Sequence, residues 1–449
     1  MTGTSAVEAS SAAARRRARA LSVGEGMLQA CMVGFSESYL GAFAVQLGHG
    51  DAALALLTTL PLFVGGFAQI LSGPCASLLG SYKRLVLVGA AAQTLSHLAF
   101  IAIAHTGDTR LWPLLVAKIL FWGSGSLITP AWGAWMGELT EDTRQARYFA
   151  WRSGAAQLAL LASFSAAGVV LHGGEARGTT LAAFALLLSL GFLSRLLSLG
   201  VFALQLGDTH PIPWRGLGTR MRLAVRSGSW RIPIFMGALM FGAQLSVPFF
   251  TPYMLRVLRL DFGAFAVLTA TAIGAKMIVF PLYHPIAERV GLRSVLLFAG
   301  MGAVATPVAW AFAPGYGALL AAQVLSGAAW GGVEFASFQL LLGAAGRECR
   351  GEFLSLANAL SGTLQLAGAV IGGGLLTQLD LEYQQVFLVS SAFRAAALLV
   401  LVLSVRAIEI PMRLPRLIWR ARTVRPTTGA VREPVLQELI PEEGGREAR

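Results

Sequence analysis

Charged residues are scarce in this sequence. Only 13% of its 449 residues are Asp, Glu, Lys or Arg, while 55% are hydrophobic. An ordinary soluble protein has roughly 25% charged residues. Because the apolar residues are spread along the whole chain, one soluble core cannot bury them, and an apolar solvent is required. The few charges gather in short clusters between apolar runs, which is the pattern that a bilayer imposes.

Cysteines and catalytic motifs are also sparse. The three cysteines (Cys31, Cys75 and Cys349) lie within or beside apolar runs, so they predict neither a disulfide framework nor a metal site. The sequence contains no Gly-x-Ser-x-Gly, no His-Glu-x-x-His and no Walker-type phosphate loop. The net charge of +12 forms no stripe, so we expect no nucleic-acid partner. We therefore expect a protein that is not an enzyme and that holds no cofactor or metal.

Twelve apolar runs are long enough to cross a bilayer, for which about 20 residues are needed. They fall near 21–47, 52–76, 85–105, 111–136, 152–172, 179–206, 232–255, 263–284, 294–313, 317–342, 354–377 and 385–405. The predicted fold class is an all-α membrane protein with twelve transmembrane helices in two pseudo-symmetric six-helix bundles.

The distribution of Lys and Arg predicts the orientation. Nearly all of them lie in the two tails and in alternate gaps, while the opposite face has only Arg110, Arg177, Arg256 and Arg259. Because cytoplasmic loops carry the excess of positive charge, both termini are expected in the cytoplasm. The predicted parts are a cytoplasmic tail (1–20), a six-helix bundle (21–206), a cytoplasmic central loop (207–231), a second six-helix bundle (232–405) and a cytoplasmic C-terminal tail (406–449) that we expect to be largely mobile.

An internal repeat relates the two bundles. Ser77 and Glu288 are 211 residues apart, as are Gly80 and Gly291, and Trp122 precedes Trp330 by 208 residues. Asp51 with Asp261 and Arg195 with Arg394 give similar offsets. Two parallel six-helix repeats predict a substrate site between the halves, with alternating access by rocking of one half against the other.

The residues after the second and eighth runs carry a family resemblance. Gly73, Gly80 and Lys83-Arg84 follow the second run, and Glu288, Arg289, Gly291 and Arg293 follow the eighth. With twelve spans split six and six, the chain resembles bacterial-type members of the major facilitator superfamily over about 20–410. In that family these loops gate the cytoplasmic side, and their acidic residue helps to latch the halves together. Ser77 replaces that acid in the first loop, so a latch is expected from Glu288 alone.

Ionisable residues at membrane depth are functional hypotheses, since they are costly unless they face a cavity or a partner. Glu37 lies about 16 residues into the first run, or roughly 24 Å. It predicts a coupling or substrate-binding group, with a buried structural hydrogen bond as the alternative. Glu25 lies near the cytoplasmic end and is interpreted as an interfacial group. Lys276, near the middle of the eighth run, must find a carboxylate, a carbonyl or water.

A mirrored polar stripe follows the fourth and tenth runs. Lys118, Trp122 and Ser126 share one helical face, and Ser326, Trp330 and Glu334 repeat that spacing 208 residues later. The resemblance implies that the first, fourth, seventh and tenth helices line a central cavity, so we predict that the two stripes face each other across it. The alternatives are that the tryptophans are packing wedges and that Lys118 extends to the membrane surface.

Other polar residues receive narrower interpretations. Gln244, with Pro248 and Thr251, adds polarity to the seventh run and completes the predicted binding or coupling set. Arg195 and Arg394 are interpreted as structural, and His97 as a hydrogen-bonded residue between helices.

The leading functional hypothesis is secondary active transport of a small organic solute across the inner membrane by alternating access. The absence of a nucleotide site argues for a gradient as the driving force. Proton coupling through Glu37 or Glu334 is part of this hypothesis, because desolvation helps a carboxylate to exchange protons near neutral pH. The expected partners are a small-molecule substrate, protons and the lipid bilayer, and the expected state is a monomer. The alternative is a sensor or lipid-handling protein that keeps the carrier fold.

Overall fold

The computed structural model describes residues 3–139, 145–205, 217–227 and 229–344, followed by 350–404. Cys349 and the tail from 405 onward lie outside the described residues. Within the described ranges the chain forms helices and no strand.

The described part of the first half contains nine helical elements. These are α1 (Gly3–Phe35), η1 (Glu37–Tyr39), α2 (Leu40–Gln46), α3 (Asp51–Ile70), α4 (Ser72–Leu79), α5 (Tyr82–Thr106), α6 (Leu111–Leu139), α7 (Gln145–Ala176) and α8 (Thr180–Leu204). The short helix α9 (Leu217–Ser227) lies in the central loop. The second half contains α10 (Arg231–Gln244), α11 (Val247–Pro252), η2 (Tyr253–Val257), α12 (Phe262–Val279), η3 (Phe280–Leu282), α13 (Tyr283–Val290), α14 (Leu292–Ala311), α15 (Tyr316–Ala344), α16 (Arg350–Thr377) and α17 (Tyr383–Ser404).

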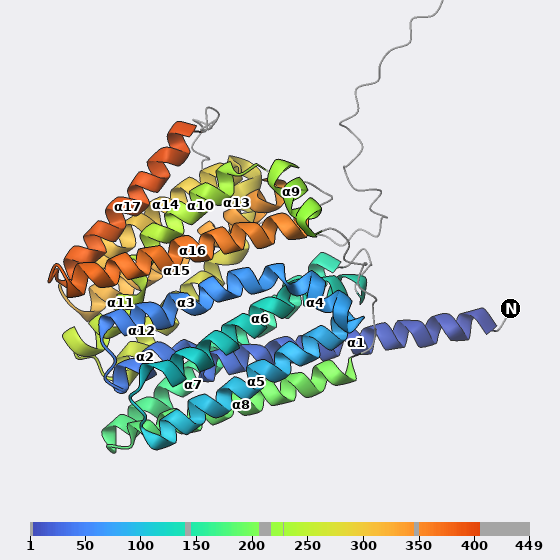
Figure 1. The fold of residues 1–449 in the computed structure, drawn as a ribbon, viewed down its shortest axis with the longest axis horizontal. Helices are drawn as coiled ribbons and strands as arrows, with labels where there is room; N and C mark the ends of the chain where they lie inside the picture. The colour runs from blue at the N-terminus through green and yellow to red at the C-terminus, as the bar shows by residue number, and fades with distance from the viewer. Residues whose placement is uncertain (1–2, 140–144, 206–216, 228, 345–349, 405–449) are drawn as a thin grey trace, which may run out of the picture. The chain divides into compact units, whose positions relative to one another are not determined.

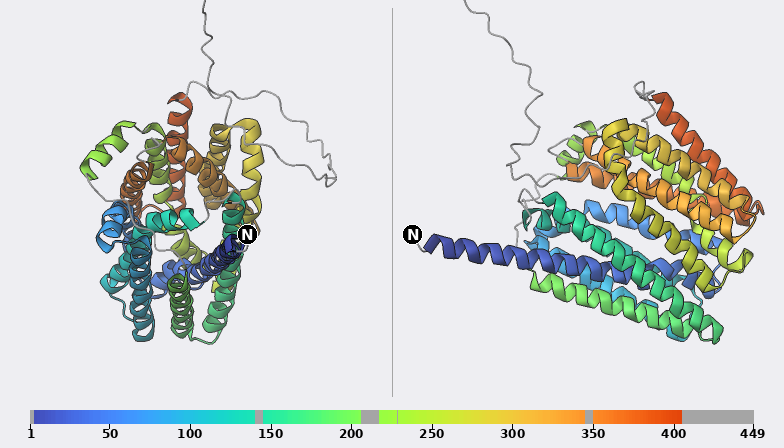
Figure 2. Two further views of the ribbon diagram at one scale, coloured as in Figure 1. Left: turned by 90° about the vertical axis from the view of Figure 1, so that its right-hand side faces the viewer. Right: turned by 180° about the vertical axis from the view of Figure 1, so that it is seen from behind.

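Membrane-spanning length and apolar composition are found in eleven helical stretches of the described chain, from Asp51–Ile70 to Tyr383–Val402. The first segment, from α1 to α2, adds a twelfth; it carries Glu25 and Glu37 along its length. The chain is therefore a multi-pass membrane protein, and the predicted all-α fold with twelve membrane segments is confirmed. α1 begins at Gly3, so the predicted N-terminal tail is helical and extends past the neighbouring helices (Figure 2).

The internal repeat appears as matching interruptions in matching helices. The first membrane segment breaks at Ser36 and the seventh at Ser246, 210 residues later. The second segment ends at Gly80 with φ of 67°, and the eighth ends at Gly291 with φ of 82°. Because a side chain disfavours positive φ, glycine suits both ends. The offset read from the sequence therefore corresponds to equivalent breaks and ends in the helices.

The two halves touch mainly through two helix pairs. α3 lies beside α16, and α7 lies against α12, which brings distant parts of the sequence together (Figure 1). Gly66 of α3 and Gly362 of α16 permit the first contact: a Cβ on Gly66 would lie 2.9 Å from the Asn358 carbonyl oxygen, and one on Gly362 would lie 3.1 Å from that of Leu62. Small residues at such positions allow membrane helices to approach closely.

The buried apolar residues are distributed unequally between the two ends of the bundle. One end of the bundle contains α4, α9 and the start of α10, and we call it the basic end. We call the other end of the bundle the opposite end. At the opposite end one cluster joins both halves, with Phe43, Phe184, Phe249 and Phe387 among its members. At the basic end the clusters are separate, one around Trp135 in the first half and one in the second half.

Candidate functional site

Glu37 lies directly after the break in the first membrane segment. Ser36 Oγ donates a hydrogen bond to the Met32 carbonyl oxygen at 2.7 Å and contacts Nε2 of His97 at 3.1 Å. The other ring nitrogen of His97 lies 3.0 Å from the Gln93 carbonyl oxygen. His97 is therefore a hydrogen-bonded residue between helices, as the sequence interpretation has it. These contacts hold the chain where α1 ends and Glu37 begins η1.

Glu37 meets two other predicted site residues. Its carboxylate is hydrogen-bonded to the Trp122 side chain and lies within electrostatic reach of the Lys118 ammonium. Lys118 is only 8% exposed, so it does not extend to the membrane surface. Opposite charges attract where water is excluded, while burial opposes the charge on each group. Three residues predicted from separate positions on α6 and the first segment thus lie together, with Lys118 buried and Glu37 and Trp122 half-buried.

Ser126 occupies a different environment from Lys118 and Trp122. A Cβ on Gly65 of α3 would lie 2.6 Å from Ser126 Oγ, so this hydroxyl lies at the packed contact between α3 and α6. Ser126 shares a helical face with Lys118 and Trp122, but its turn of α6 packs against α3. Substrate contact by Ser126 stays a prediction.

Trp330 and Glu334 of the stripe on α15 contact two different neighbouring side chains. The guanidinium of Arg394 lies over the Trp330 ring, 5.8 Å from its centroid. The Lys276 ammonium pairs with Glu334 at 2.6 Å, so the lysine on α12 has the carboxylate partner that its depth requires. Glu334 also lines a cavity of about 580 Å³ together with Phe280, Phe335, Ser337, Phe338, Gln339 and Leu341. The contacts described here for these residues lie within the second half, and the facing of the two stripes across a central cavity stays a prediction.

Gln244 connects the seventh and eleventh membrane segments. Its Nε2 donates to Oε1 of Gln365 at 3.1 Å, while its own Oε1 is buried without a hydrogen-bond partner among the described residues. Gln365 was not predicted as a site residue, because an amide in a membrane helix is not distinctive without its partner. The orphaned oxygen leaves Gln244 able to accept one further hydrogen bond.

The predicted gating residues lie at the basic end. Gly73 lines a pocket with Arg220 and Glu352, whose side chains pair at 2.6 Å. Glu288 faces His284 one turn earlier at 3.7 Å, and both side chains are exposed. Gly80 and Gly291 end their helices, while Arg289 and Arg293 are exposed. The latch expected from Glu288 stays a prediction, and the described polar link between the halves at this end is Asn358 Nδ2 to Gln69 Oε1 at 2.7 Å.

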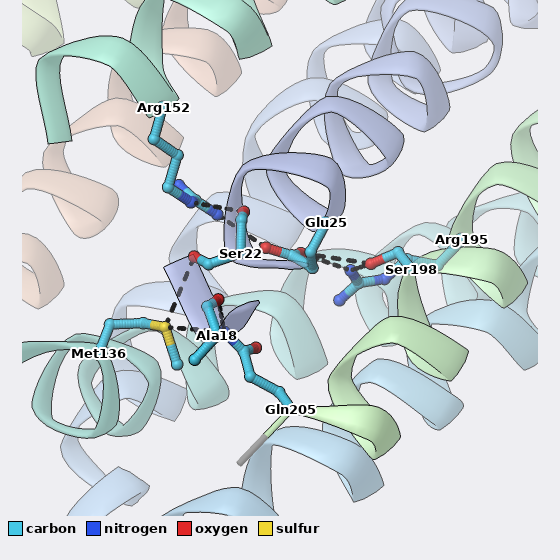
Figure 3. Close-up of polar contacts among 8 residues, drawn as sticks. All are labelled: Ala18, Ser22, Glu25, Met136, Arg152, Arg195, Ser198 and Gln205. Carbon is cyan, nitrogen blue, oxygen red and sulfur yellow. Dashed lines mark hydrogen bonds and ion pairs between the residues drawn. The ribbon is translucent and has the colours of Figure 1, made fainter. Parts of the chain in front are cut away.

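A buried ionic cluster at the basic end of the first half was not predicted as a site. Arg152 Nη2 donates to Glu25 Oε2 at 2.7 Å, and Arg195 Nη1 lies 3.8 Å from Glu25 Oε1 (Figure 3). Ser198 Oγ accepts from Arg195 at 2.9 Å and donates to Glu25 at 3.2 Å. The interfacial interpretation of Glu25 was wrong, because its side chain is 0% exposed. The sequence signal was available in the charges at positions 25, 152 and 195, but their pairing depends on helix rotation.

Polar links join the two halves at the opposite end. Tyr383 Oη donates to both carboxylate oxygens of Asp51 at 2.9 Å, and Arg256 Nη1 lies 3.4 Å from the same carboxylate. Arg256 also donates to the His49 carbonyl oxygen, and burial together with the Arg256 charge lowers the pKa of His49. The main-chain N–H of Phe262 donates to Glu175 at 2.9 Å. This end is therefore closed by side chains as well as by the shared apolar cluster.

Comparison with known structures identifies the fold. No protein-family model and no curated protein sequence matches the chain. A solved structure of a mutant of the nucleoside transporter NupG is similar with a TM-score of 0.67 and 11% identity, over 86% of this chain and 99% of that one. A POT family transporter in complex with 5-aminolevulinic acid gives a TM-score of 0.69 and 12% identity, over 88% and 97%.

The xylose transporter XylE from E. coli, in a partially occluded inward open conformation, gives a TM-score of 0.66 and 11% identity, over 88% of this chain and 98% of that one. The chain has the fold of these transporters. This fold agrees with the twelve-helix fold that the sequence resemblance implied. At such low identity the likeness establishes the fold alone, and the residues of the site must carry any statement about function.

Proposed function

We propose that this chain is a secondary active transporter that moves a small organic solute across the inner membrane by alternating access. The observation that best supports this proposal is that the two halves contact each other differently at the two ends of the bundle. They share one apolar cluster and the Asp51 links at the opposite end, but have separate clusters at the basic end. Such an arrangement favours rocking of rigid halves about a site between them.

The Glu37–Lys118–Trp122 cluster supports a role in substrate binding or proton coupling. A carboxylate at membrane depth lies near an ammonium and accepts a hydrogen bond from the Trp122 side chain, so protonation of Glu37 would remove its attraction to Lys118. Lys276 and Glu334 offer a second pair in the other half. The names of the similar structures, which include nucleoside and xylose transporters, support a small polar solute as the cargo.

The proposal includes the orientation and state of the protein. The excess of Lys and Arg supports a cytoplasmic basic end with both termini inside. We propose that it acts as a monomer and a carrier rather than an enzyme, with the lipid bilayer, the solute and protons as partners.

A second candidate is a lipid-handling protein with the same fold. It is favoured by an apolar cavity of about 890 Å³ between α10, α16 and α17, lined by Ile234, Phe393 and Val400 among others. Ile234 and Val400 are exposed on the outer surface of the helices. Movement of labelled phospholipid between leaflets, without solute accumulation, would favour this candidate.

Uptake into proteoliposomes tests the proposal. The purified chain would be reconstituted with an imposed pH gradient and offered a panel of nucleosides, pentoses, amino acids and short peptides. We expect at least one solute to accumulate, and Glu37→Gln to abolish the pH-driven component. Glu382→Gln, which changes a carboxyl near the opposite end, serves as the control and should behave as the wild type. Accumulation of no solute would contradict the transport proposal, and equal pH dependence in wild type and Glu37→Gln would contradict coupling through Glu37.

A further inference from the structure

A small polar cavity lies beside the buried ionic cluster of the first half. Its volume is about 200 Å³. It is lined by Gln29, Gly125, Ile128, Thr129, Trp132, Arg152, Arg195 and Phe202. A site for a whole small molecule usually measures about 300–1,000 Å³, so this cavity suits one chemical group of a solute or a small ion.

Positive charge exceeds negative charge around this cavity. Arg152 and Arg195 both pair with the single carboxylate of Glu25 (Figure 3). Arg195 is 1% exposed, and its Nε has no hydrogen-bond partner among the described residues. Arg152 lies over the Trp132 ring at 4.4 Å, which fixes the guanidinium plane at the cavity wall. Arg152, Arg195 and Glu25 together carry two positive charges and one negative charge, so one positive charge is not compensated within this group.

A buried uncompensated charge is costly, and an anion entering the cavity would offset that cost. Guanidinium groups bind carboxylates and phosphates well because their planar N–H donors match two oxygens at once. Arg394, the repeat partner of Arg195, is arranged differently. Its Nη atoms donate to neutral acceptors, the carbonyl oxygens of Ala303 and Ala243 and the hydroxyl of Ser246. Arg394 is also buried with an orphaned Nε, so what distinguishes the first half is the pair of guanidinium groups, Arg152 and Arg195, that line one small cavity.

The cavity is lined by residues of the same two membrane segments that carry the cluster around Glu37. Gln29 and Thr129 are exposed residues of α1 and α6 at the cavity wall. The same helical segments carry Glu37, Lys118 and Trp122. Gln29 precedes Glu37 by eight residues, which is about 12 Å along a helix. That separation is within the length of a small organic solute.

We propose that this cavity is an oxyanion subsite that receives a carboxylate or phosphate group of the transported solute. The inference rests on the proposed transport function and deepens it by naming the substrate class as organic anions. Arg152 and Arg195 supply the positive charge, Gln29 and Thr129 supply polar contacts at the entrance, and Trp132 holds Arg152 in place.

Anion binding by the purified full-length chain tests this proposal without any transport. Thermal unfolding would be followed while inorganic phosphate or acetate is titrated against sodium chloride at constant ionic strength. Thr129→Leu fills the cavity and leaves every charge intact, whereas Arg152→Gln removes one guanidinium. Arg226→Gln, which changes an exposed arginine on α9, is the matched control.

We expect saturable stabilisation of the wild type and of Arg226→Gln by phosphate or acetate. Affinity should fall by about tenfold or more in Thr129→Leu and Arg152→Gln. Stabilisation that does not saturate, or that is the same in all four proteins, would overturn the proposal, because it would be a general salt effect. If Arg152→Gln does not fold, Thr129→Leu decides the question, since the Thr129 hydroxyl bonds, among the described residues, only to its own helix at Gly125.

The two proposals fail in different ways. Saturable phosphate binding that depends on Thr129, with no solute accumulated in proteoliposomes, would leave the subsite standing and contradict transport. Accumulation of a solute at wild-type rates by Thr129→Leu, without specific anion binding to the wild type, would leave transport standing and overturn the subsite.

Discussion

At the scale of single residues, Glu37 and Lys118 determine each other's environment. Both lie at membrane depth, and their opposite charges attract each other. Trp122 adds a hydrogen bond to the carboxylate, so the tryptophan is part of a polar cluster in addition to its apolar packing. Glu37 and Lys118 are thus the residues of the first half that we expect to respond to a proton.

The pair can be tested by a double-mutant cycle. Glu37→Gln and Lys118→Met should each destabilise the protein by about 3 kcal/mol, because each leaves one buried charge without its partner. The double variant should lose less than the sum of the two losses, because both charges are then absent. Denaturant unfolding in matched detergent measures all four corners of the cycle. Additive losses would show that the two side chains do not interact.

The sequence predicted Glu37, Lys118 and Trp122 as functional residues, but it could not predict their contact. Spacing defines which residues share a helical face, whereas contact depends on how each helix is rotated against its neighbours. The break at Ser36 changes the direction of the chain just before Glu37, and no residue pattern indicates it. Glu25 shows the same difficulty, since its depth suggested an interfacial group and rotation places it between two arginines.

At the scale of helical elements, the repeat could be predicted from the sequence because some of the repeated residues lie at helix ends and breaks. Glycines at positive φ end both second segments of the halves, and these glycines can be found by their constant offset. Contacts between the halves were less predictable. α3 and α16 meet through glycines and alanines, and such residues are abundant throughout a chain with 51 glycines.

Gly66 offers a test of the contact between α3 and α16. Gly66→Val should lower the stability by about 1–3 kcal/mol, because the new side chain meets the Asn358 carbonyl oxygen and forces the helices apart. Gly374→Val, on α16, is the control, since a Cβ there meets no atom within 4 Å. Both variants replace a helical glycine with valine, so intrinsic helix propensity is matched. Equal melting temperatures for the two variants would contradict the close contact.

At the scale of the whole molecule, the repeat, the shared cluster and the polar links correspond to one of the two states that the proposed alternating access requires. The opposite end is closed by Asp51, Arg256 and Tyr383, whereas the apolar clusters at the basic end are separate. In the other state of the proposed cycle, we expect these contacts to break as others form at the basic end. Composition alone could predict the twelve segments, but not which end is closed in this state.

Distance measurements between spin labels at both ends test that central claim most directly. In a cysteine-free chain, one label pair would be placed at Thr109 and Leu379 of the opposite end, and another at Leu78 and Arg289 of the basic end. The combined variant Arg256→Gln/Tyr383→Phe removes the polar links to Asp51. Our account predicts that the opposite-end distance then lengthens while the basic-end distance shortens. Two distances that both stay unchanged, or that change in the same direction, would contradict rocking of the halves.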